Sequence, residues 1–206
     1  MSLAGVEAVA FDLDDTLIDW ATGIARAAAA VGAPDISERV RTETWVRRDG
    51  VVVDRQHWRT LHEPHTFMPE AVVGAFLAAL DPPLFSDVAP TINALRGRVR
   101  LALLTNNPFG TQVVERHGLH VDCFDCVVVA DPRMRKPDPR AFGRLVAALG
   151  VPAADIAYVG DSVPADVEGA IRAGLRAVWL DRWGDPWLPP DGVVRITSLL
   201  ELPAQC

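Results

Sequence analysis

Five short apolar segments rich in Val, Ile and Leu alternate with longer amphipathic stretches along the chain. They span residues 6–11, 99–104, 126–130, 156–159 and 177–180. This alternation is typical of βαβ units, in which helices cover both faces of a parallel sheet. We therefore expect an α/β fold with a parallel-sheet, Rossmann-like core. Helices are predicted to begin near Phe109, Pro139 and Pro164, the last two because proline suits the first helical turn.

The interval between the first two apolar segments breaks this rhythm. Residues 20–86 show helical periodicity without a convincing buried strand, so we expect a small all-α helical cap inserted there. The adjacent prolines Pro82 and Pro83 stop the last of its helices. The predicted domains are an α/β core of residues 1–19 and 87–206 and a helical cap of residues 20–86. Within the cap, Val51–Val53 could form a strand, but a connection between two helices is the favoured interpretation.

Composition limits the partners of the chain. Its 206 residues, half of them hydrophobic, include 20 Lys and Arg against 27 Asp and Glu, a formal net charge of −7. This charge disfavours binding to nucleic acid or to an anionic membrane. No segment approaches the roughly 18 apolar residues of a membrane helix, and the first residues lack a basic stretch before an apolar core. We expect a soluble, cytoplasmic protein; monomer and homodimer are equally compatible with the sequence.

Polar residues follow four of the predicted strands. They are Asp12 and Asp14 after the first, Thr105, Asn106 and Asn107 after the second, Lys136 after the third, and Asp161 and Asp166 after the fourth. Ligands of parallel sheets bind beyond the carboxyl ends of the strands, so these side chains are expected to share one site. Carboxylates gathered there repel one another unless a cation is present, and oxygen ligands suit Mg²⁺. Thr105, Lys136 and the backbone N–H of Asn106 would then hold a phosphate.

Two carboxylates at this spacing can divide the chemistry of phosphoryl transfer. One attacks phosphorus as a nucleophile, while the other protonates the leaving group and later activates water. Taken singly, each residue has an ordinary structural explanation, since Asp and Thr form turns and caps and Lys is usually solvated. Their order, each after its own strand, favours a shared catalytic site.

The four motifs FDLDDT, LLTN, RKPDP and VGDSVPAD resemble those of the haloacid dehalogenase superfamily of hydrolases, in the phosphatase-type subgroup with a helical cap after the first motif. The resemblance implies that Asp12 is a nucleophile forming an aspartyl phosphate and that Asp14 is the general acid and base. It implies Mg²⁺ bound by the Asp12 carboxylate, the Asp14 carbonyl and Asp161, with Asp166 supporting the metal shell or Lys136. It also implies that Thr105, Asn106 and Lys136 bind the phosphoryl group.

The expected reaction is Mg²⁺-dependent hydrolysis of a phosphate monoester, with a small phosphorylated metabolite as the partner. Carbon–halogen hydrolases of the superfamily lack an acid at position 14 and need no metal. Phosphomutases usually have Gly where this chain has Asp15, which lowers that alternative without excluding it. A phospho-receiver domain would place its acceptor after the third strand and would lack the insert. An inactive binding protein has no support from the motifs.

The sequence does not identify the natural substrate, because the roles of several residues in the predicted cap stay open. They comprise His57, His62 and His65 and the arginines Arg47, Arg48, Arg55 and Arg59. A surface or cap-core position is the favoured interpretation of the histidines, with a substrate contact as the alternative. The arginines are interpreted as residues of solvated helix surfaces, with contact to a substrate anion under a closed cap as the alternative. Trp183 and Trp187, after the last predicted strand, are expected to pack over the sheet edge.

Overall fold

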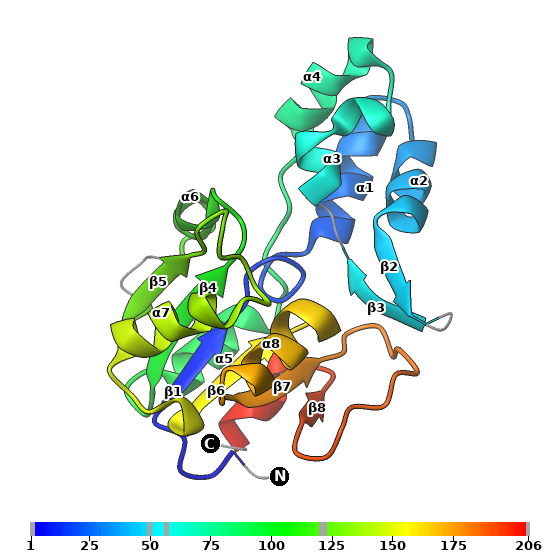
Figure 1. Cartoon of the computed structure of the whole chain (residues 1–206). Helices are drawn as coiled ribbons and strands as arrows, with labels where there is room; N and C mark the ends of the chain where they lie inside the picture. Colours follow the sequence, from blue (N-terminus) through cyan, green and yellow to red (C-terminus); the bar gives the residue numbers. More distant parts are fainter. Residues whose placement is uncertain (1–2, 49–50, 56–57, 120–122, 205–206) are drawn as a thin grey trace.

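The computed structural model describes residues 3–48, 51–55, 58–119 and 123–204. In this part of the chain six parallel strands form one sheet in the order β5-β4-β1-β6-β7-β8 (Figure 1). The strands are β1 (Ala8–Phe11), β4 (Arg100–Thr105), β5 (Cys126–Val129), β6 (Ile156–Gly160), β7 (Arg176–Leu180) and β8 (Val194–Ile196). The predicted α/β class and the five predicted strands are confirmed, and β8 is an additional edge strand.

The central strand β1 is buried on both faces, and its small and large residues alternate. Val9 and Phe11 lie in one apolar cluster, and Ala8 and Ala10 lie in a second cluster on the opposite face. The first cluster includes residues of α5 (Val88–Leu95), α6 (Gly110–Arg116) and the 3₁₀ helix η5 (Leu199–Ala204); the second includes residues of α7 (Pro139–Leu149) and α8 (Glu168–Arg172). The core is therefore a three-layer structure of helices, sheet and helices.

The predicted helix starts agree with the structure. Phe109 is the N-cap of α6, and Pro139 is the first residue of α7, where Asp138 caps the helix by accepting from the Arg140 N–H. Pro164 lies in a π-helical turn, η4 (Val163–Val167), that leads directly into α8. A single-turn 3₁₀ helix, η3 (Ala153–Asp155), precedes β6.

The insert after β1 is mainly helical. It contains α1 (Trp20–Ala30), α2 (Asp35–Glu43), α3 (Trp58–His62), the 3₁₀ turn η1 (Pro64–Thr66) and α4 (Glu70–Ala79). The expectation that it is all-α was wrong in one place, because β2 (Trp45–Arg48) and β3 (Val51–Arg55) form an antiparallel hairpin. Val51–Val53 thus belong to a strand. Consecutive β-branched residues favour extended backbone, and the Asp49-Gly50 pair in the sequence is a hairpin signal.

Two adjacent segments connect the insert to the core. Asp19 donates its backbone N–H to the Pro83 carbonyl at 2.8 Å, and Phe85 donates to the Leu17 carbonyl at 3.0 Å. Gly23 in α1 faces the returning chain, where an added Cβ would lie 2.6 Å from the Pro82 Cα, so that only glycine fits. The domain boundaries after residues 19 and 86 stay a prediction. None of the helices in the described ranges is long and apolar enough to cross a membrane.

Candidate active site

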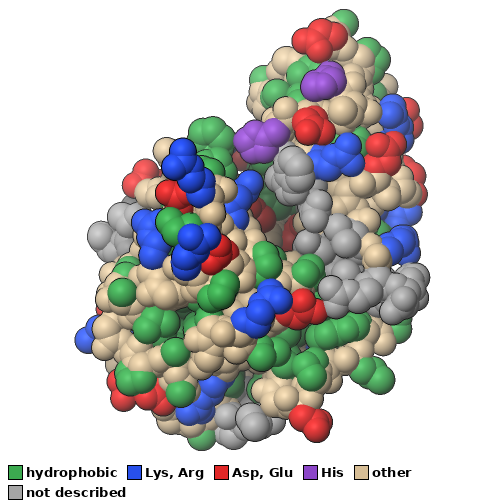
Figure 2. All heavy atoms as spheres, in the orientation of Figure 1, with side chains coloured by type: hydrophobic (Ala, Val, Ile, Leu, Met, Phe, Trp, Pro, Cys, Tyr) green, Lys and Arg blue, Asp and Glu red, His purple; other side chains and the backbone are tan. Residues whose placement is uncertain are grey.

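The carboxyl ends of β1, β4 and β6 open into a cavity of about 410 Å³ between the core and the insert. Figure 2 shows this hollow, with acidic side chains inside it. Every predicted site residue except Thr105 lines the cavity: Asp12, Asp14, Asn106, Lys136, Asp161 and Asp166. The insert contributes Trp20, Arg55, Leu61 and His62. The structure therefore brings together most of the residues that the sequence singled out.

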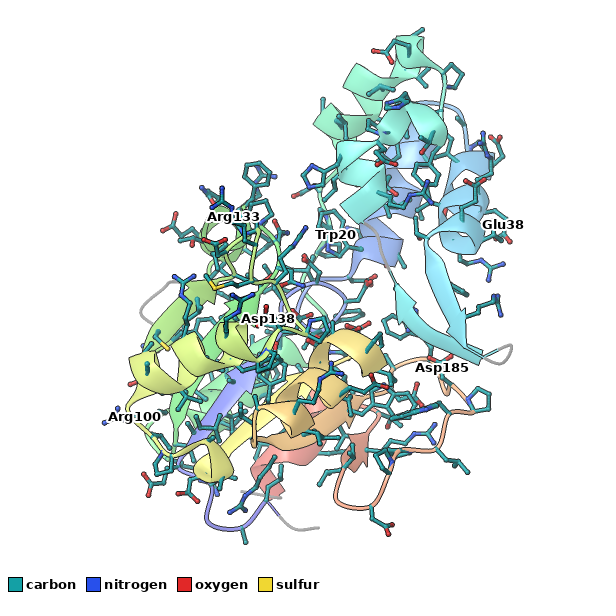
Figure 3. All side chains as sticks on the ribbon, in the orientation of Figure 1. Trp20, Glu38, Arg100, Arg133, Asp138 and Asp185 are labelled. Atoms are coloured by element: carbon teal, nitrogen blue, oxygen red, sulfur yellow. The ribbon has the colours of Figure 1, made fainter. Side chains whose placement is uncertain are left out.

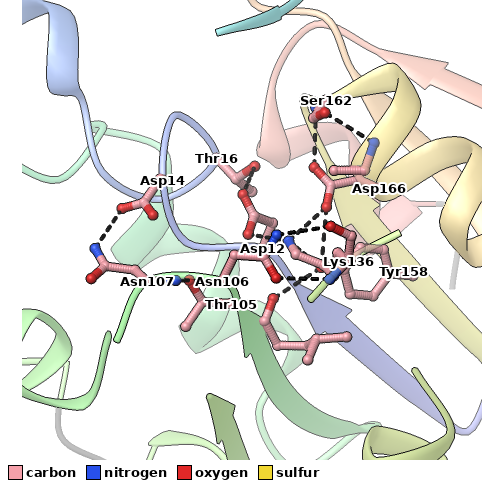
Figure 4. Close-up of polar contacts among 12 residues, drawn as sticks. Asp12, Asp14, Thr16, Thr105, Asn106, Asn107, Lys136, Tyr158, Ser162 and Asp166 are labelled. Carbon is pink, nitrogen blue, oxygen red and sulfur yellow. Dashed lines mark hydrogen bonds and ion pairs between the residues drawn. The ribbon is translucent and has the colours of Figure 1, made fainter. Parts of the chain in front are cut away.

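Lys136 is the centre of the polar network in the cavity floor. Its Nζ donates to Asp12 Oδ1, to Asp166 Oδ1 at 2.7 Å and to the Tyr158 hydroxyl at 2.9 Å (Figure 4). Only 3% of its side chain is exposed. Burial alone would lower the pKa of Lys136, but Asp12 and Asp166 hold this pKa well above its usual value. The ammonium group therefore keeps its charge between the two carboxylates.

Asp12 and Asp161 both lie in an electrostatically unfavourable position. Burial raises the pKa of Asp12 well above its usual range, and Asp166 and Asp14 add to this effect while Lys136 opposes it. Burial, followed by the charges of Asp15 and Asp166, likewise raises the pKa of Asp161. A cation beside these carboxylates would oppose both increases in pKa and favour the charged forms.

The acidic cluster fits a divalent cation. Carboxylate oxygens of Asp12, Asp161 and Asp166 lie within 4.8 Å of one another. Asp161 Oδ2 is buried and receives no hydrogen bond from any described residue, as expected for an oxygen that binds a metal ion. The Asp161 carbonyl accepts from Trp179 Nε1 at 3.1 Å, which fixes the backbone of this residue. A small set of oxygen ligands is the type of site that Mg²⁺ prefers.

Asp166 is already engaged on both carboxylate oxygens. Oδ1 accepts from Lys136 at 2.7 Å and from the Tyr158 hydroxyl at 3.3 Å, and Oδ2 accepts from the Ser162 N–H at 3.0 Å. Gly160 makes room for it, because an added Cβ there would lie 2.4 Å from Asp166 Oδ2. These contacts favour the supporting role of Asp166, in which it holds Lys136 and the loop after β6.

The loop after β4 is held by side chain to backbone hydrogen bonds. The Asn106 amide accepts from the Lys136 N–H at 2.8 Å and donates to the Lys136 carbonyl at 3.0 Å. Thr105 Oγ1 accepts from the Asn107 N–H at 3.0 Å and is fully buried below the cavity. Thr105 thus shapes the loop, and its contact with a phosphate stays a prediction.

Asp14 lies on the side of the cavity that faces the insert. Its Oδ1 accepts from Trp20 Nε1 at 2.8 Å and from Asn107 Nδ2 at 3.1 Å. Burial raises the pKa of Asp14, and these two hydrogen bonds oppose the rise. Asp15, the next residue, has a φ of 60°, a left-handed conformation that Asp tolerates better than most residues.

Sequence reasoning missed Trp20 and Tyr158, and it placed Asn107 after the second strand without giving it a role. Asn107 directly follows the predicted Asn106, and Tyr158 is the one hydroxyl-bearing residue in the apolar strand β6, so weak signals existed for both. Nothing in the local sequence indicates that the Trp20 indole reaches Asp14. Figure 3 shows Trp20 at the end of α1 that lies nearest the core.

The cap histidines and arginines, whose roles the sequence did not assign, lie in different environments. His62 lines the cavity, His65 is exposed in η1, and His57 lies outside the described residues. Arg55 also lines the cavity, with 5% of its side chain exposed; it pairs with Asp185 at 3.3 Å and lies 3.6 Å from the Trp183 ring centroid. Its expected solvated position was therefore wrong, because the core loop after β7 covers it.

The other arginines and the two tryptophans are closer to expectation. Arg47 is exposed, and Arg59 pairs with Glu63 at 3.6 Å on a partly exposed helix surface. The side chain of Arg48 lies outside what the structure describes. Trp187 packs edge-on against Trp179 with ring centroids 4.9 Å apart, and Trp183 packs edge-on against Phe85 at 6.4 Å. The predicted packing over the sheet edge is confirmed for Trp187, which lies against strand β7. Trp183 instead lies against Phe85 and Arg55 and is 38% exposed, so its packing over the sheet stays a prediction.

Comparison with known proteins gives consistent matches. Residues 6–174 match the model of the haloacid dehalogenase-like hydrolases. The N-acylneuraminate-9-phosphatase of Homo sapiens is 30% identical over 240 aligned residues, which cover 99% of this chain and 95% of that protein. The chain thus aligns with a curated phosphatase along nearly its whole length.

Two solved structures share the fold. The HAD phosphatase from Thermococcus onnurineus has a TM-score of 0.64 and 28% identity and covers 95% of both chains. The putative HAD-hydrolase YfnB from Bacillus subtilis, solved bound to magnesium, has a TM-score of 0.71 and 22% identity and covers 96% of both chains. The core and the insert are both included in these matches.

Proposed function

The chain belongs to the haloacid dehalogenase-like hydrolases, and from this membership we propose that it hydrolyses the phosphate monoester of a small metabolite through an aspartyl phosphate on Asp12. The observation that carries the proposal is the pair Asp12 and Asp14, which open onto one cavity in different environments. Lys136 contacts Asp12, whereas two neutral N–H donors contact Asp14. Such differences allow two carboxylates to take different roles.

In the first half of the reaction, Asp12 attacks phosphorus and the leaving oxygen takes a proton from Asp14. Thr16 Oγ1 approaches Asp12 Oδ2 at 3.5 Å, and Lys136 holds Oδ1, so the nucleophile has little freedom to rotate. Lys136 and the backbone N–H groups after β4 would bind the phosphoryl oxygens. Their positive charge and donors stabilise the charge that spreads over these oxygens in the transition state.

In the second half, Asp14 accepts a proton from a water molecule as this water attacks phosphorus and releases Asp12. The insert helps to exclude bulk water, since Trp20, Leu61 and His62 cover one side of the cavity. Asp14 also favours phosphoester hydrolysis over carbon–halogen hydrolysis, which requires no acid at this position.

The Asp12 carboxylate, the Asp14 carbonyl and Asp161 would hold Mg²⁺, with Asp166 in support. When bound, the ion neutralises charge on the carboxylates and on the phosphoryl oxygens. Asp161 Oδ2, which has no partner among the described residues, and the proximity of the three carboxylates support this assignment. The magnesium in the related Bacillus subtilis structure is consistent with it.

Phosphate release from a panel of phosphoesters tests the proposal, with Mg²⁺ or with excess EDTA. The panel contains nucleoside monophosphates, phosphoglycolate and sugar phosphates, between which the sequence does not choose. Metal-dependent release of inorganic phosphate is expected, and it separates hydrolysis from phosphoryl transfer within a sugar. A cytoplasmic location, with reduced cysteines and soluble metabolites, is part of the same proposal.

Two matched variants sharpen this test. Asp12→Asn should abolish turnover while the melting temperature stays near that of the wild type, and Asp35→Asn, the same change at an exposed position, should leave turnover unchanged. Mg²⁺ at 100 times its dissociation constant should raise the unfolding free energy of the wild type by about 2.7 kcal/mol. The unfolding free energy of Asp161→Asn should not rise when Mg²⁺ is added. Turnover by Asp12→Asn would rule out the covalent mechanism.

A further inference from the structure

Two nitrogen donors converge on one oxygen of Asp14. Trp20 Nε1 donates to Oδ1 at 2.8 Å and Asn107 Nδ2 donates to the same oxygen at 3.1 Å. Among the described residues no donor contacts Oδ2, and Asp14 lines the cavity. In Figure 4 the Asn107 amide reaches one carboxylate oxygen, and the other oxygen is turned away from it.

The two donors come from different parts of the chain. Trp20 is the first residue of α1 in the insert, and Asn107 follows β4 in the core. Asp19 fixes the start of α1, because its carboxylate accepts from the Thr22 N–H at 2.9 Å and from the Thr22 hydroxyl at 2.7 Å. Trp20 is 5% exposed, and its indole has no acceptor atom, so the Nε1–H contacts Asp14 as a donor.

We infer that Trp20 and Asn107 are positioning residues that fix Asp14 by Oδ1 and leave Oδ2 to transfer the proton; this rests on the proposed hydrolysis. An oxygen that accepts two N–H bonds is suited to carry the charge of the carboxylate, so the proton resides on the other oxygen. As the phosphorus–oxygen bond to the leaving group breaks, the Oδ2–H bond breaks and the proton passes to the leaving oxygen. In the second half, Oδ2 takes one proton from the attacking water, and Asp12 leaves phosphorus as a carboxylate.

The test is the leaving-group dependence of kcat/KM, which reports the steps up to loss of the leaving group. Trp20→Phe keeps an aromatic ring and removes the N–H. An alkyl phosphate needs its leaving oxygen protonated, whereas p-nitrophenolate leaves without a proton. General acid catalysis contributes about 10²–10⁴-fold, so Trp20→Phe should lower kcat/KM by about tenfold or more for glycerol phosphate. The loss for p-nitrophenyl phosphate should be less than about threefold, because this leaving group bypasses the acid.

Trp45→Phe is the matched control. Trp45 also lies in the insert, and its buried Nε1 donates to none of the described residues, so neither substrate should respond to this change. Asn107→Ala removes the second donor from Oδ1 and should reproduce the selective loss on the alkyl phosphate. This second variant keeps the test decisive if Trp20→Phe proves unstable by thermal unfolding.

A double variant identifies the route of the effect. In an Asp14→Asn background, Trp20→Phe should cause no further loss, because the residue that it positions no longer acts as an acid. Equal losses on both substrates, an unchanged alkyl phosphate rate, or a full additional loss in the Asp14→Asn background would overturn the inference. Absence of phosphate release by the wild type would instead overturn the proposed function, and this inference with it.

Discussion

The side-chain amide of Asn106 pairs reciprocally with the backbone of Lys136, 30 residues away in the sequence. One bond runs from the Lys136 N–H to the amide oxygen and the other from the amide nitrogen to the Lys136 carbonyl. The pair ties the loop after β4 to the loop that presents the buried ammonium group. The position of Lys136 therefore depends on Asn106.

Asn106→Ala should lower kcat/KM by about tenfold. Two hydrogen bonds of about 1 kcal/mol each are lost, and the Lys136 loop gains freedom. Steady-state kinetics with Mg²⁺ and the best phosphoester of the panel measure the effect. Asn93→Ala, the same substitution at an exposed position of α5, serves as the control. Wild-type kinetics in Asn106→Ala would show that the reciprocal pair does not position Lys136.

Removal of the Lys136 ammonium should cost both stability and activity. Lys136→Met leaves Asp12 and Asp166 buried without their cation, and breaking such a pair typically costs about 3–5 kcal/mol. Urea unfolding at pH 7 with EDTA measures this loss. In the double variant Lys136→Met with Asp166→Asn, part of the stability should return because one buried charge is gone, whereas turnover should stay absent. Equal stability of single and double variants would argue against charge burial as the cause.

The ion pair of Arg182 and Asp87 should make stability depend on pH. Arg182 donates to both Asp87 oxygens at 2.8 and 3.0 Å and to the Thr16 carbonyl at 2.8 Å, beside the connection to the insert. Burial would raise the pKa of Asp87, but hydrogen bonds from Arg182 and the Leu199 backbone bring this pKa below its usual value. A lowered folded-state pKa stabilises the protein above the unfolded pKa of about 4, and the stabilisation is lost as pH falls through the folded value.

Asp87→Asn should therefore be less stable than the wild type at pH 7, and the difference in unfolding free energy should narrow as the pH falls below about 4. Urea unfolding at a series of pH values measures it. Asp35→Asn, at an exposed position, should give a small difference at every pH. A difference for Asp87→Asn that stays constant from pH 7 to pH 3 would contradict the role assigned to the ion pair.

Two glycine substitutions should have opposite effects. Gly160→Ala would place a Cβ 2.3 Å from Asp166 Cγ, so Asp166 and its contact with Lys136 must shift; unfolding free energy and turnover should both fall. Gly143 lies inside α7, and an added Cβ there would meet no atom within 4 Å, so Gly143→Ala should stabilise the protein by about 0.5–1 kcal/mol and leave turnover unchanged. Thermal unfolding and kinetics of both variants check this. A stable, active Gly160→Ala enzyme would show that the loop after β6 can move freely.

The sequence predicted much of the core and of the cavity floor. Strands are encoded locally by short apolar runs, and the carboxyl ends of parallel strands meet at one edge, so Asp12, Asp14, Lys136 and Asp161 could be placed together before any coordinates. The hairpin of β2 and β3 was missed because three valines between helical patterns are too short a run for periodicity to distinguish a strand from a connection. The domain boundaries and the catalytic roles of these residues stay predictions.

The sequence alone thus determined which residues reach the carboxyl edge of the sheet, because that follows from hydrophobic periodicity and strand order. Only the tertiary structure decided their partners. Lys136 meets Asp12 across 124 residues and Arg55 meets Asp185 across 130, while the Trp20 indole turns toward Asp14. Such contacts depend on how the insert and the core pack around one cavity, and no local pattern of residues encodes the direction in which a side chain points once that packing is complete.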